Sequence, residues 1–537
     1  MTMPRSLFSV KPSASFWWIL LAAFAFRLLT ALLCVVVTDE MPQYYRAAES
    51  LLAGEGMRDL LGRPLVFHVP ALTWLAALVS FVLPTWATSD VVFAGFGTLM
   101  TAAVGWLALE LYGERAAWYA MGLVSVLPVL SAVVLSSDTH LLLLGFLFTQ
   151  AAVSWLLMRD PPTWPRCAAW GLLGALAYLS RPEAIVHSAL WAALILWWNA
   201  PRFRENFPLR LSQALCGLVC FLALALPYWL WLHEHMGRWS LSGGAFPTYA
   251  FDRNTVPDGV SWAKARELYG DEAFEQRSVL LAMRHNPGMV VKKLRSGTKI
   301  FFQYLGSLNG FPAFLFVFAG LGLFASPRSW EHRRPALHLL ALLGLLPSFL
   351  YVFFFINERY LSTLMPFLCV WCAGGFLAFE AWADSAVKAA RSRALVRKIP
   401  AAVLVLLFLL NGTLLISAYR NQRLEHKAAG LWLREHIREP YRLCADPRIT
   451  YYAGLAAQGG AVPIKSCAPL DKPLYIAASR IRGNADMQAK DPLWASFMTE
   501  NPPPSWEHVA TVEARGERVY IHRCVGGAGE PLEDSGP

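Results

Sequence analysis

Long apolar runs recur along the first 420 residues of this 537-residue chain, and they constrain its fold more than any other feature. Crossing the hydrocarbon core of a bilayer takes about 20 consecutive apolar residues of helix. Inside a bilayer the backbone must satisfy its own hydrogen bonds, which helices do. The sequence therefore predicts an all-α polytopic membrane bundle over residues 1–419. Residues 420–537 have ordinary polarity and alternate a helical stretch with short β-like runs, so we expect a small α/β domain there.

Clusters of Lys and Arg between the apolar runs indicate which ends of the helices face the cytoplasm. Six clusters do so: Arg5 and Lys11; Arg115; Arg159 and Arg166; Arg202, Arg204 and Arg210; Arg328, Arg333 and Arg334; and Lys388, Arg391, Arg393, Arg397 and Lys398. The net charge of +10 comes from basic residues at the positions that membrane orientation requires. We therefore expect no nucleic-acid partner.

The segment 67–84 is predicted to lie in the outer membrane interface without crossing. If both this segment and 91–112 crossed after the first helix, Arg115 would lie outside, against the charge rule. The segment carries His68 and is bounded by prolines, so it is the weaker candidate for a crossing. About eleven crossings then remain: 16–37, 91–112, 116–135, 139–158, 167–180, 183–198, 211–232, 309–326, 336–356, 361–382 and 400–419. The segments 167–180 and 183–198 are short for full crossings. They could instead form a broken pair of helices that meets near the outer leaflet.

This topology places the N-terminus in the cytoplasm and the domain 420–537 outside, with outer loops at 38–90 and 233–308. A bacterial inner membrane fits the pattern. The outer domain contains Cys444, Cys467 and Cys524, and in an oxidising compartment we expect one disulfide, between Cys444 and Cys467.

Polar groups gather at the predicted outer ends of the helices. They are Asp39 and Glu40 after the first crossing, Asp138, Arg181 with Glu183, and Glu358 with Arg359. Charges at the mouth of a membrane bundle are expensive to desolvate, so they pair with one another or line a wet cavity. Taken singly they have structural alternatives, because Asp138 is placed to cap a helix and Arg359–Tyr360 to anchor one at the interface. Their convergence at one end predicts a reaction site.

The chemistry available there is acid, base and cation together. A carboxylate such as Asp39 can take the proton from an attacking hydroxyl, and Arg181 and Arg359 can stabilise a phosphate that leaves with negative charge. In the outer loop, Lys292, Lys293, Arg295 and Lys299 are placed to attract lipid phosphates. A solvated helix face is the alternative for each of these four.

The order of these motifs resembles the GT-C class of membrane glycosyltransferases. The matching features are the Asp-Glu pair after the first helix, the YYRAAESLLAGEG helix, a Phe-x-x-Pro stretch (FHVP, 67–70), the LYGER turn, Asp138, SRPE, and ERYLSTLMP. Within the class the chain is most similar to the protein O-mannosyltransferase and aminoarabinose transferase families. It also resembles the mannosyltransferases of glycolipid-anchor assembly.

The resemblance implies an inverting hexosyl or pentosyl transferase that moves a sugar from a polyprenyl-phosphate carrier to a glycan, lipid or protein hydroxyl. It implies catalytic roles for Asp39, Glu40 and Asp138. Substrate-binding roles fall on Tyr44, Tyr45, Arg63, His68, Arg181, Glu183, Glu358, Arg359 and Tyr360.

Two departures from the families bear on the site. Aminoarabinose transferases have Glu-Lys where this chain has His68 and Val69, so Arg63, Arg181 and Arg359 have to supply the cation. Oligosaccharyltransferases have Asp-x-Asp where this chain has a single aspartate, Asp138, so no tightly bound metal is implied, and dependence on a divalent metal stays open. No glycine-rich phosphate loop suggests a nucleotide cofactor.

Two other functions compete with the enzyme. A transporter or flippase of lipid-linked sugars would line a translocation path with the same charges, but such proteins often show internal repeats and midplane charges that this chain lacks. The second alternative is a receptor that binds a ligand through residues 420–537.

Overall fold

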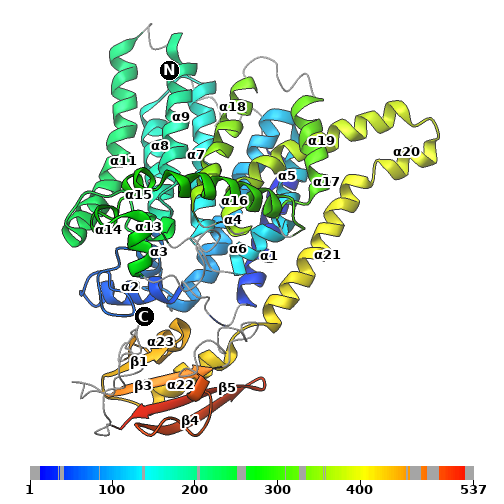
Figure 1. The fold of residues 1–537 in the computed structure, drawn as a ribbon. Coiled ribbons are helices and arrows are strands. Elements are labelled where there is room, and N and C mark those ends of the chain that lie inside the picture. Colours follow the sequence, from blue (N-terminus) through cyan, green and yellow to red (C-terminus); the bar gives the residue numbers. More distant parts are fainter. Residues whose placement is uncertain are drawn as a thin grey trace. The chain divides into compact units, whose positions relative to one another are not determined.

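Helices dominate the structure, a computed structural model (Figure 1). It describes residues 12–33, 36, 41–83, 85–135, 139–201, 206–250, 262–308, 310–325, 334–354, 356, 358–454, 457–459, 473–479 and 495–525. Contacts divide the chain into two units. The first comprises residues 1–32, 66–72 and 90–417, and the second comprises 33–65, 73–89 and 418–537.

The first unit is a bundle of apolar helices. Its main helices are α1 (Ala14–Leu32), α4 (Thr85–Tyr112), α5 (Glu114–Val126), α6 (Pro128–Leu135), α7 (His140–Arg159), α8 (Trp164–Ser180), α9 (Ala184–Trp198), α11 (Phe207–Met236), α17 (Ala313–Phe324), α18 (Arg334–Leu345), α19 (Met365–Ala386) and α21 (Ile399–Arg420). Within the described residues, seven helical stretches are long and apolar enough to cross a membrane. The predicted polytopic membrane protein is confirmed, and the number of eleven crossings stays a prediction.

The segment predicted to lie in the interface forms only a short helix, α3 (Ala71–Val79), of 9 residues. At 1.5 Å per residue it is about 14 Å long, roughly half of a hydrocarbon core. The Phe16 ring, at the start of α1, lies against Gly105 in the second half of α4, whereas Arg27 lies against Gly97 further back along α4. Helices α1 and α4 are therefore antiparallel, and the start of α1 is at the same end of the bundle as Arg115.

Ion pairs tie that end of the bundle together. Arg115 at the start of α5 donates to Glu380 near the end of α19 at 2.6 Å, and the Tyr119 hydroxyl donates to the other oxygen of Glu380 at 2.6 Å. Arg159 at the end of α7 pairs with Glu110 near the end of α4 at 2.9 Å. These contacts place one end of α4, α5, α7 and α19 at a common level.

Asp160 extends the same network. It accepts from Arg159 and from Arg166 of α8, each at 3.1 Å. Burial acts to raise the pKa of Asp160, but the hydrogen bonds and charges of Arg159 and Arg166 outweigh it and lower this pKa below its ordinary value. We call Glu110, Arg115, Arg159, Asp160, Arg166 and Glu380 the ion-paired end.

Helices of the bundle approach closely where glycines face each other. A Cβ at Gly322 of α17 would lie 1.8 Å from the Trp371 carbonyl of α19, and one at Gly375 would lie 1.8 Å from the Phe318 carbonyl. Small residues at both positions let the two backbones touch, as membrane helix pairs commonly do. A side chain at either glycine would force α17 and α19 apart.

The predicted crossing 116–135 is broken into α5 and α6 at Leu127–Pro128. Because Pro128 has no N–H, the carbonyl of Val124 loses its partner within the helix. The guanidinium of Arg27, only 3% exposed, supplies one: Nη2 donates to this carbonyl at 3.1 Å. A buried arginine of α1 therefore satisfies the backbone group that the proline left unpaired.

A row of short elements follows α11. They are α12 (Ala245–Ala250), α13 (Trp262–Tyr269), α14 (Asp271–Glu275), α15 (Val279–His285) and the longer α16 (Pro287–Leu305). Two 3-10 helices, η2 (Leu346–Phe353) and η3 (Glu358–Thr363), lie between α18 and α19, and α20 (Ala390–Val396) precedes α21. The hydroxyl groups of Ser348 and Thr363 are 2.8 Å apart and join η2 to η3.

The second unit contains the predicted small α/β fold. Five strands lie in the order β2 (Ala457–Gly459), β1 (Tyr441–Ala445), β3 (Leu474–Ser479), β5 (Glu517–Cys524) and β4 (Trp506–Ala514). β1 pairs in parallel with β2 and β3, and the others are antiparallel. Helices α22 (Leu424–His436) and α23 (Pro447–Ala453) contribute Leu433 and Ile449 to its core.

The same unit includes α2 (Met41–Leu52), the helix that follows the predicted catalytic pair. Tyr45 of α2 and Tyr451 of α23 are in ring contact, with centroids 5.6 Å apart. The division into domains 1–419 and 420–537 stays a prediction, and the contacts add α2 to the group that packs around α23.

The predicted Cys444–Cys467 disulfide is wrong. Cys444 is a free, partly buried thiol on β1, whereas Cys524 at the end of β5 is disulfide-bonded. Spacing along the sequence does not specify which cysteines a sheet brings within bonding distance.

Candidate active site

Four predicted site residues lie together in the first unit: Arg181, Glu183, Arg359 and Tyr360. Asp39, Glu40 and Asp138 lie outside the described residues, and so does the side chain of Glu358. The four are joined by two residues that the sequence analysis did not single out, His140 and Tyr351. We call these six the arginine–tyrosine cluster.

Glu183 is the central acceptor of the cluster. Helix α8 ends at Ser180, where Arg181 turns to an extended backbone before Pro182, and Glu183 precedes α9. Arg181 Nε donates to Glu183 Oε1 at 2.6 Å, and the Tyr351 hydroxyl of η2 donates to the same oxygen. The two charged side chains are only 16% and 15% exposed, so this ion pair is largely shielded from water. Partners on two sides hold the carboxylate in one orientation.

Arg181 also donates through Nη1 to Nδ1 of His140, at the start of α7, over 3.2 Å. An arginine has no acceptor, so Nδ1 must be the unprotonated nitrogen of the ring. His140 is therefore assigned as the neutral tautomer with its proton on Nε2.

Both arginines of the cluster lie over the Tyr360 ring. The guanidinium carbon of Arg181 is 4.8 Å from its centroid, and that of Arg359 is 5.5 Å away. The rings of His140 and Tyr351 each lie 5.1 Å from the same ring. Stacking on an aromatic face fixes a guanidinium plane while its N–H groups remain able to donate.

Among its described side chains the cluster brings two guanidinium groups together with one carboxylate and one imidazole. Such an arrangement suits an anion with several acceptor oxygens, such as a phosphate. Among the described residues no group of three or more His, Cys, Asp and Glu could hold a metal ion.

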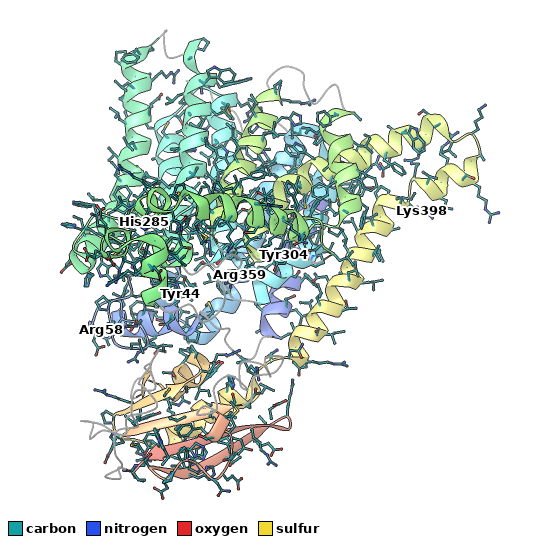
Figure 2. The ribbon with its side chains drawn as sticks, viewed as in Figure 1. Tyr44, Arg58, His285, Tyr304, Arg359 and Lys398 are labelled. Carbon is teal, nitrogen blue, oxygen red and sulfur yellow. The ribbon has the colours of Figure 1, made fainter. Side chains whose placement is uncertain are left out.

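The cluster lies at the opposite end of the bundle from the ion-paired end. His140 begins α7 and Arg159 ends it, whereas Arg166 is near the start of α8 and Arg181 follows its end. Figure 2 shows Arg359 in the middle of the ribbon and Lys398, of a predicted cytoplasmic cluster, at the bend between α20 and α21.

The other predicted site residues with described side chains belong to α2 and to the chain that follows it. Tyr44 and Tyr45 are buried in α2, and Arg63 is exposed and pairs with Asp59 at 3.4 Å, all in the second unit. His68 belongs to the first unit and packs edge-on against Phe67, with ring centroids 5.0 Å apart. Burial favours a packing role for the two tyrosines.

The sequence offered only weak signals for the two residues that were missed. His140 follows Asp138 by two positions, and Tyr351 sits in a run of apolar residues where a hydroxyl needs a partner. That partner, Glu183, is 168 positions away.

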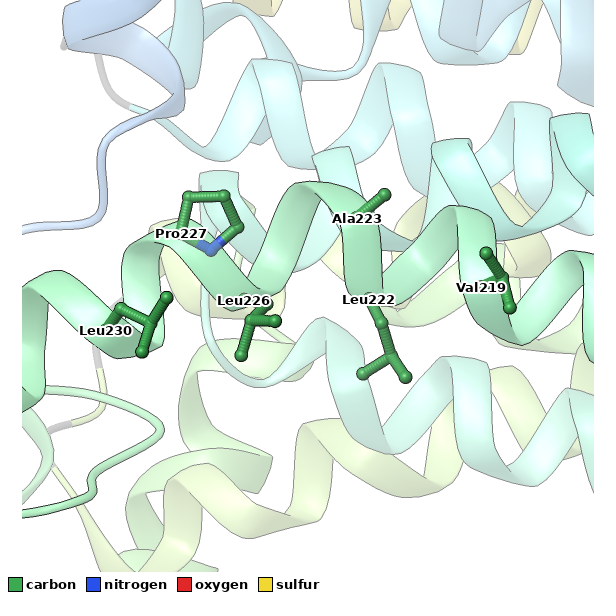
Figure 3. A pocket seen from close by; sticks show the side chains of 6 residues that line it. All are labelled: Val219, Leu222, Ala223, Leu226, Pro227 and Leu230. Atoms are coloured by element: carbon green, nitrogen blue, oxygen red, sulfur yellow. The ribbon is translucent and has the colours of Figure 1, made fainter.

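A cavity of about 360 Å³ lies along one face of α11, lined by apolar side chains around Pro227 (Figure 3). Its lining residues are Val219, Leu222, Ala223, Leu226, Pro227 and Leu230. With no charged or hydroxyl group in its lining, this cavity has no chemistry to offer a sugar or a phosphate.

The fold is that of the GT-C membrane glycosyltransferases. The crystal structure of ArnT from Cupriavidus metallidurans bound to undecaprenyl phosphate matches with a TM-score of 0.58 and 13% identity, over 95% of this chain and 98% of ArnT. The Archaeoglobus fulgidus oligosaccharyltransferase in complex with Zn and sulfate matches with a TM-score of 0.55 and 15% identity, over 94% of this chain and 72% of that one. No protein-family model matches the chain, and no curated protein sequence is significantly similar to it.

Proposed function

We propose that the protein is an inverting glycosyltransferase that moves a hexosyl or pentosyl group from a polyprenyl-phosphate carrier to a hydroxyl acceptor. The observation that carries the proposal is the arginine–tyrosine cluster, in which the guanidinium groups of Arg181 and Arg359 both lie near the Tyr360 ring at one end of a bundle with the GT-C fold. The choice of donor is supported by the likeness to ArnT along nearly the whole of both chains, because that ArnT binds undecaprenyl phosphate.

In the proposed reaction the acceptor oxygen attacks the anomeric carbon of the sugar on the face opposite the phosphate. The bond between that carbon and the phosphate oxygen breaks, and the configuration inverts. Asp39 takes the proton of the acceptor hydroxyl, while Glu40 and Asp138 orient the acceptor or the sugar.

The leaving polyprenyl phosphate carries new negative charge, and stabilising it is the role proposed for Arg181 and Arg359. The contacts to Glu183, His140 and Tyr360 hold the Arg181 guanidinium in place before the donor arrives. Such preorganisation means that little reorganisation is needed when the charge develops.

We further propose that the protein is a bacterial inner-membrane protein whose ion-paired end faces the cytoplasm. The arginine–tyrosine cluster then faces outward, as does the domain 420–537. The concentration of arginine and lysine in the short loops at the ion-paired end supports this orientation.

The test is a transfer assay in proteoliposomes with polyprenyl-phosphate sugars, comparing the wild type with Asp39→Asn. We expect transfer to fall by about 10²–10⁴-fold, the usual contribution of a general base. The matched control is Asp160→Asn, which removes one carboxylate at the ion-paired end and should leave transfer near the wild-type rate.

Unchanged transfer by Asp39→Asn would refute the assignment of the base. If the wild type transfers no sugar from any lipid-linked donor but lipid-linked sugar crosses the liposome membrane, the protein is a flippase instead.

A further inference from the structure

Helix α16 differs from the long helices of the bundle in its direction and in its surface. Figure 1 shows it lying across the direction of α11, α8 and α7. It is 19 residues long, and the Asn286 side chain caps its start by accepting from the Met289 N–H at 3.0 Å. A helix that runs across the spanning direction lies roughly in the plane of a membrane.

One stripe of α16 is buried and fixes the rotation of the helix about its axis. The Lys293 ammonium lies 4.7 Å from the centre of the Tyr249 ring. At Gly297 the helix touches η2 so closely that a Cβ would lie 2.2 Å from the Val352 carbonyl. The Phe301 ring stacks on Phe349, with centroids 4.9 Å apart.

Two further stripes of α16 are exposed and lie side by side. The apolar one consists of Val291, Leu294 and Phe302, which are 64%, 48% and 57% exposed. The basic one consists of Lys292, Arg295 and Lys299, all exposed. Lys292, Arg295 and Lys299 are three and four positions apart, and Val291, Leu294 and Phe302 are three and eight apart, so each set lies on one face of the helix.

We propose that α16 lies in the membrane–water interface and binds the headgroups of anionic phospholipids through Lys292, Arg295 and Lys299. The exposed apolar stripe next to them would enter the boundary between headgroups and acyl chains, as in interfacial amphipathic helices. A free phosphate ion would match the charges but would leave this apolar stripe in water. The combination selects a lipid.

The site is connected to the arginine–tyrosine cluster through packing. Helix α16 contacts both η2, which carries Tyr351, and η3, which carries Arg359 and Tyr360. The inference stands without the proposed enzymatic function, because it concerns only the lipid that surrounds the protein.

The test is native mass spectrometry of the full-length protein in a nonionic detergent with equimolar phosphatidylglycerol and phosphatidylcholine. The wild type should retain phosphatidylglycerol preferentially, and an excess of inorganic phosphate should not displace it. For the triple variant K292Q/R295Q/K299Q we expect affinity for phosphatidylglycerol to fall up to about fivefold for each charge removed.

The control variant R434Q/R438Q/R523Q removes three exposed charges from the C-terminal domain and should keep the wild-type preference. Thermal stability and gel filtration establish that both variants are folded. No preference for phosphatidylglycerol in the wild type, or an equal preference in K292Q/R295Q/K299Q, would overturn the proposal. Displacement by inorganic phosphate would show a simple anion site.

Discussion

The two ends of α7 and α8 use arginine in different ways. At the ion-paired end three arginines meet three carboxylates, and Arg159 reaches both Glu110 and Asp160. At the other end Arg181 and Arg359 share one aromatic ring, with a single described carboxylate, Glu183. Paired arginines hold helix ends together, whereas guanidinium groups held near an aromatic ring keep N–H groups that the proposed function directs at a phosphate. The two ends therefore differ in what their arginines contact, although both contain arginines and carboxylates.

Replacing one arginine at each end by lysine tests this difference with the largest expected effect. Lysine keeps the charge but cannot donate to Glu183 and His140 together while stacking on Tyr360. We expect Arg181→Lys to lower transfer about 100-fold, as losing one fixed donor to a developing charge does.

Arg115→Lys is the matched variant, because Arg115 is half exposed and a lysine still pairs with Glu380. Its transfer rate should stay within about twofold of wild type, as for most partly exposed ion pairs. Rates are compared per folded molecule, after gel filtration. Equal losses in the two variants would remove the proposed distinction between the ends.

A third arginine sharpens the comparison, because Arg27 is buried and donates to the carbonyl of Val124. We expect Arg27→Met to destabilise the protein by about 2 kcal/mol, the cost of an unsatisfied buried acceptor. Pro128→Ala restores a backbone N–H and lifts the restriction that a proline places on the residue before it, so that a helical Leu127 would bring this N–H to the same carbonyl. Thermal denaturation of both single variants and the double variant measures the coupling.

Arg27→Met should therefore cost less in the Pro128→Ala background than alone. If the two effects simply add, Arg27 does not act through the broken turn, and a role in binding a ligand becomes the better account.

The smallest effect concerns pH and the ion-paired end. The folded-state pKa of Asp160 is lowered, so its contribution to stability is present above its unfolded pKa, about 3.9, and is lost as pH falls from there. Because this side chain is partly exposed, we expect Asp160→Asn to cost less than about 1 kcal/mol at pH 7.

The stability difference between wild type and Asp160→Asn should shrink progressively as the pH falls below about 4. Melting temperatures measured from pH 7 down to pH 3.5 check this. A difference that persists unchanged at the lowest pH would show that Asp160 acts through packing and not through its charge.

Much of the fold could be predicted because membrane helices leave strong local signals. The length of an apolar run identifies a span. The position of the basic cluster at Arg115 predicted that the segment 67–84 does not cross, in agreement with the 9-residue α3. The proline at 128 is visible in the sequence, but the prediction treated 116–135 as one helix. The cysteine pairing failed because spacing along the chain does not determine which cysteines the fold brings within bonding distance.

The candidate site was predictable only in part. Arg181 and Glu183 are two positions apart, and Arg359 and Tyr360 are adjacent, so each pair could be recognised as a motif. The contact between these two pairs could be anticipated because both were predicted at helix ends on the same side of the membrane. The participation of His140 and Tyr351 could not be predicted, because an isolated histidine or tyrosine in an apolar run is usually part of the packing.

The sequence by itself determined that this chain spans a membrane repeatedly, and it predicted which helix ends share a side, because hydropathy and charge act on each segment separately. Only the tertiary structure decided which charges neutralise one another. Hydrogen bonds and ring stacking act over a few ångströms, so they depend on how α7, α8, η2 and η3 pack and not on spacing along the chain. That packing pairs Arg159 with Glu110 of another helix, and it holds Arg181 against Glu183, His140 and Tyr360.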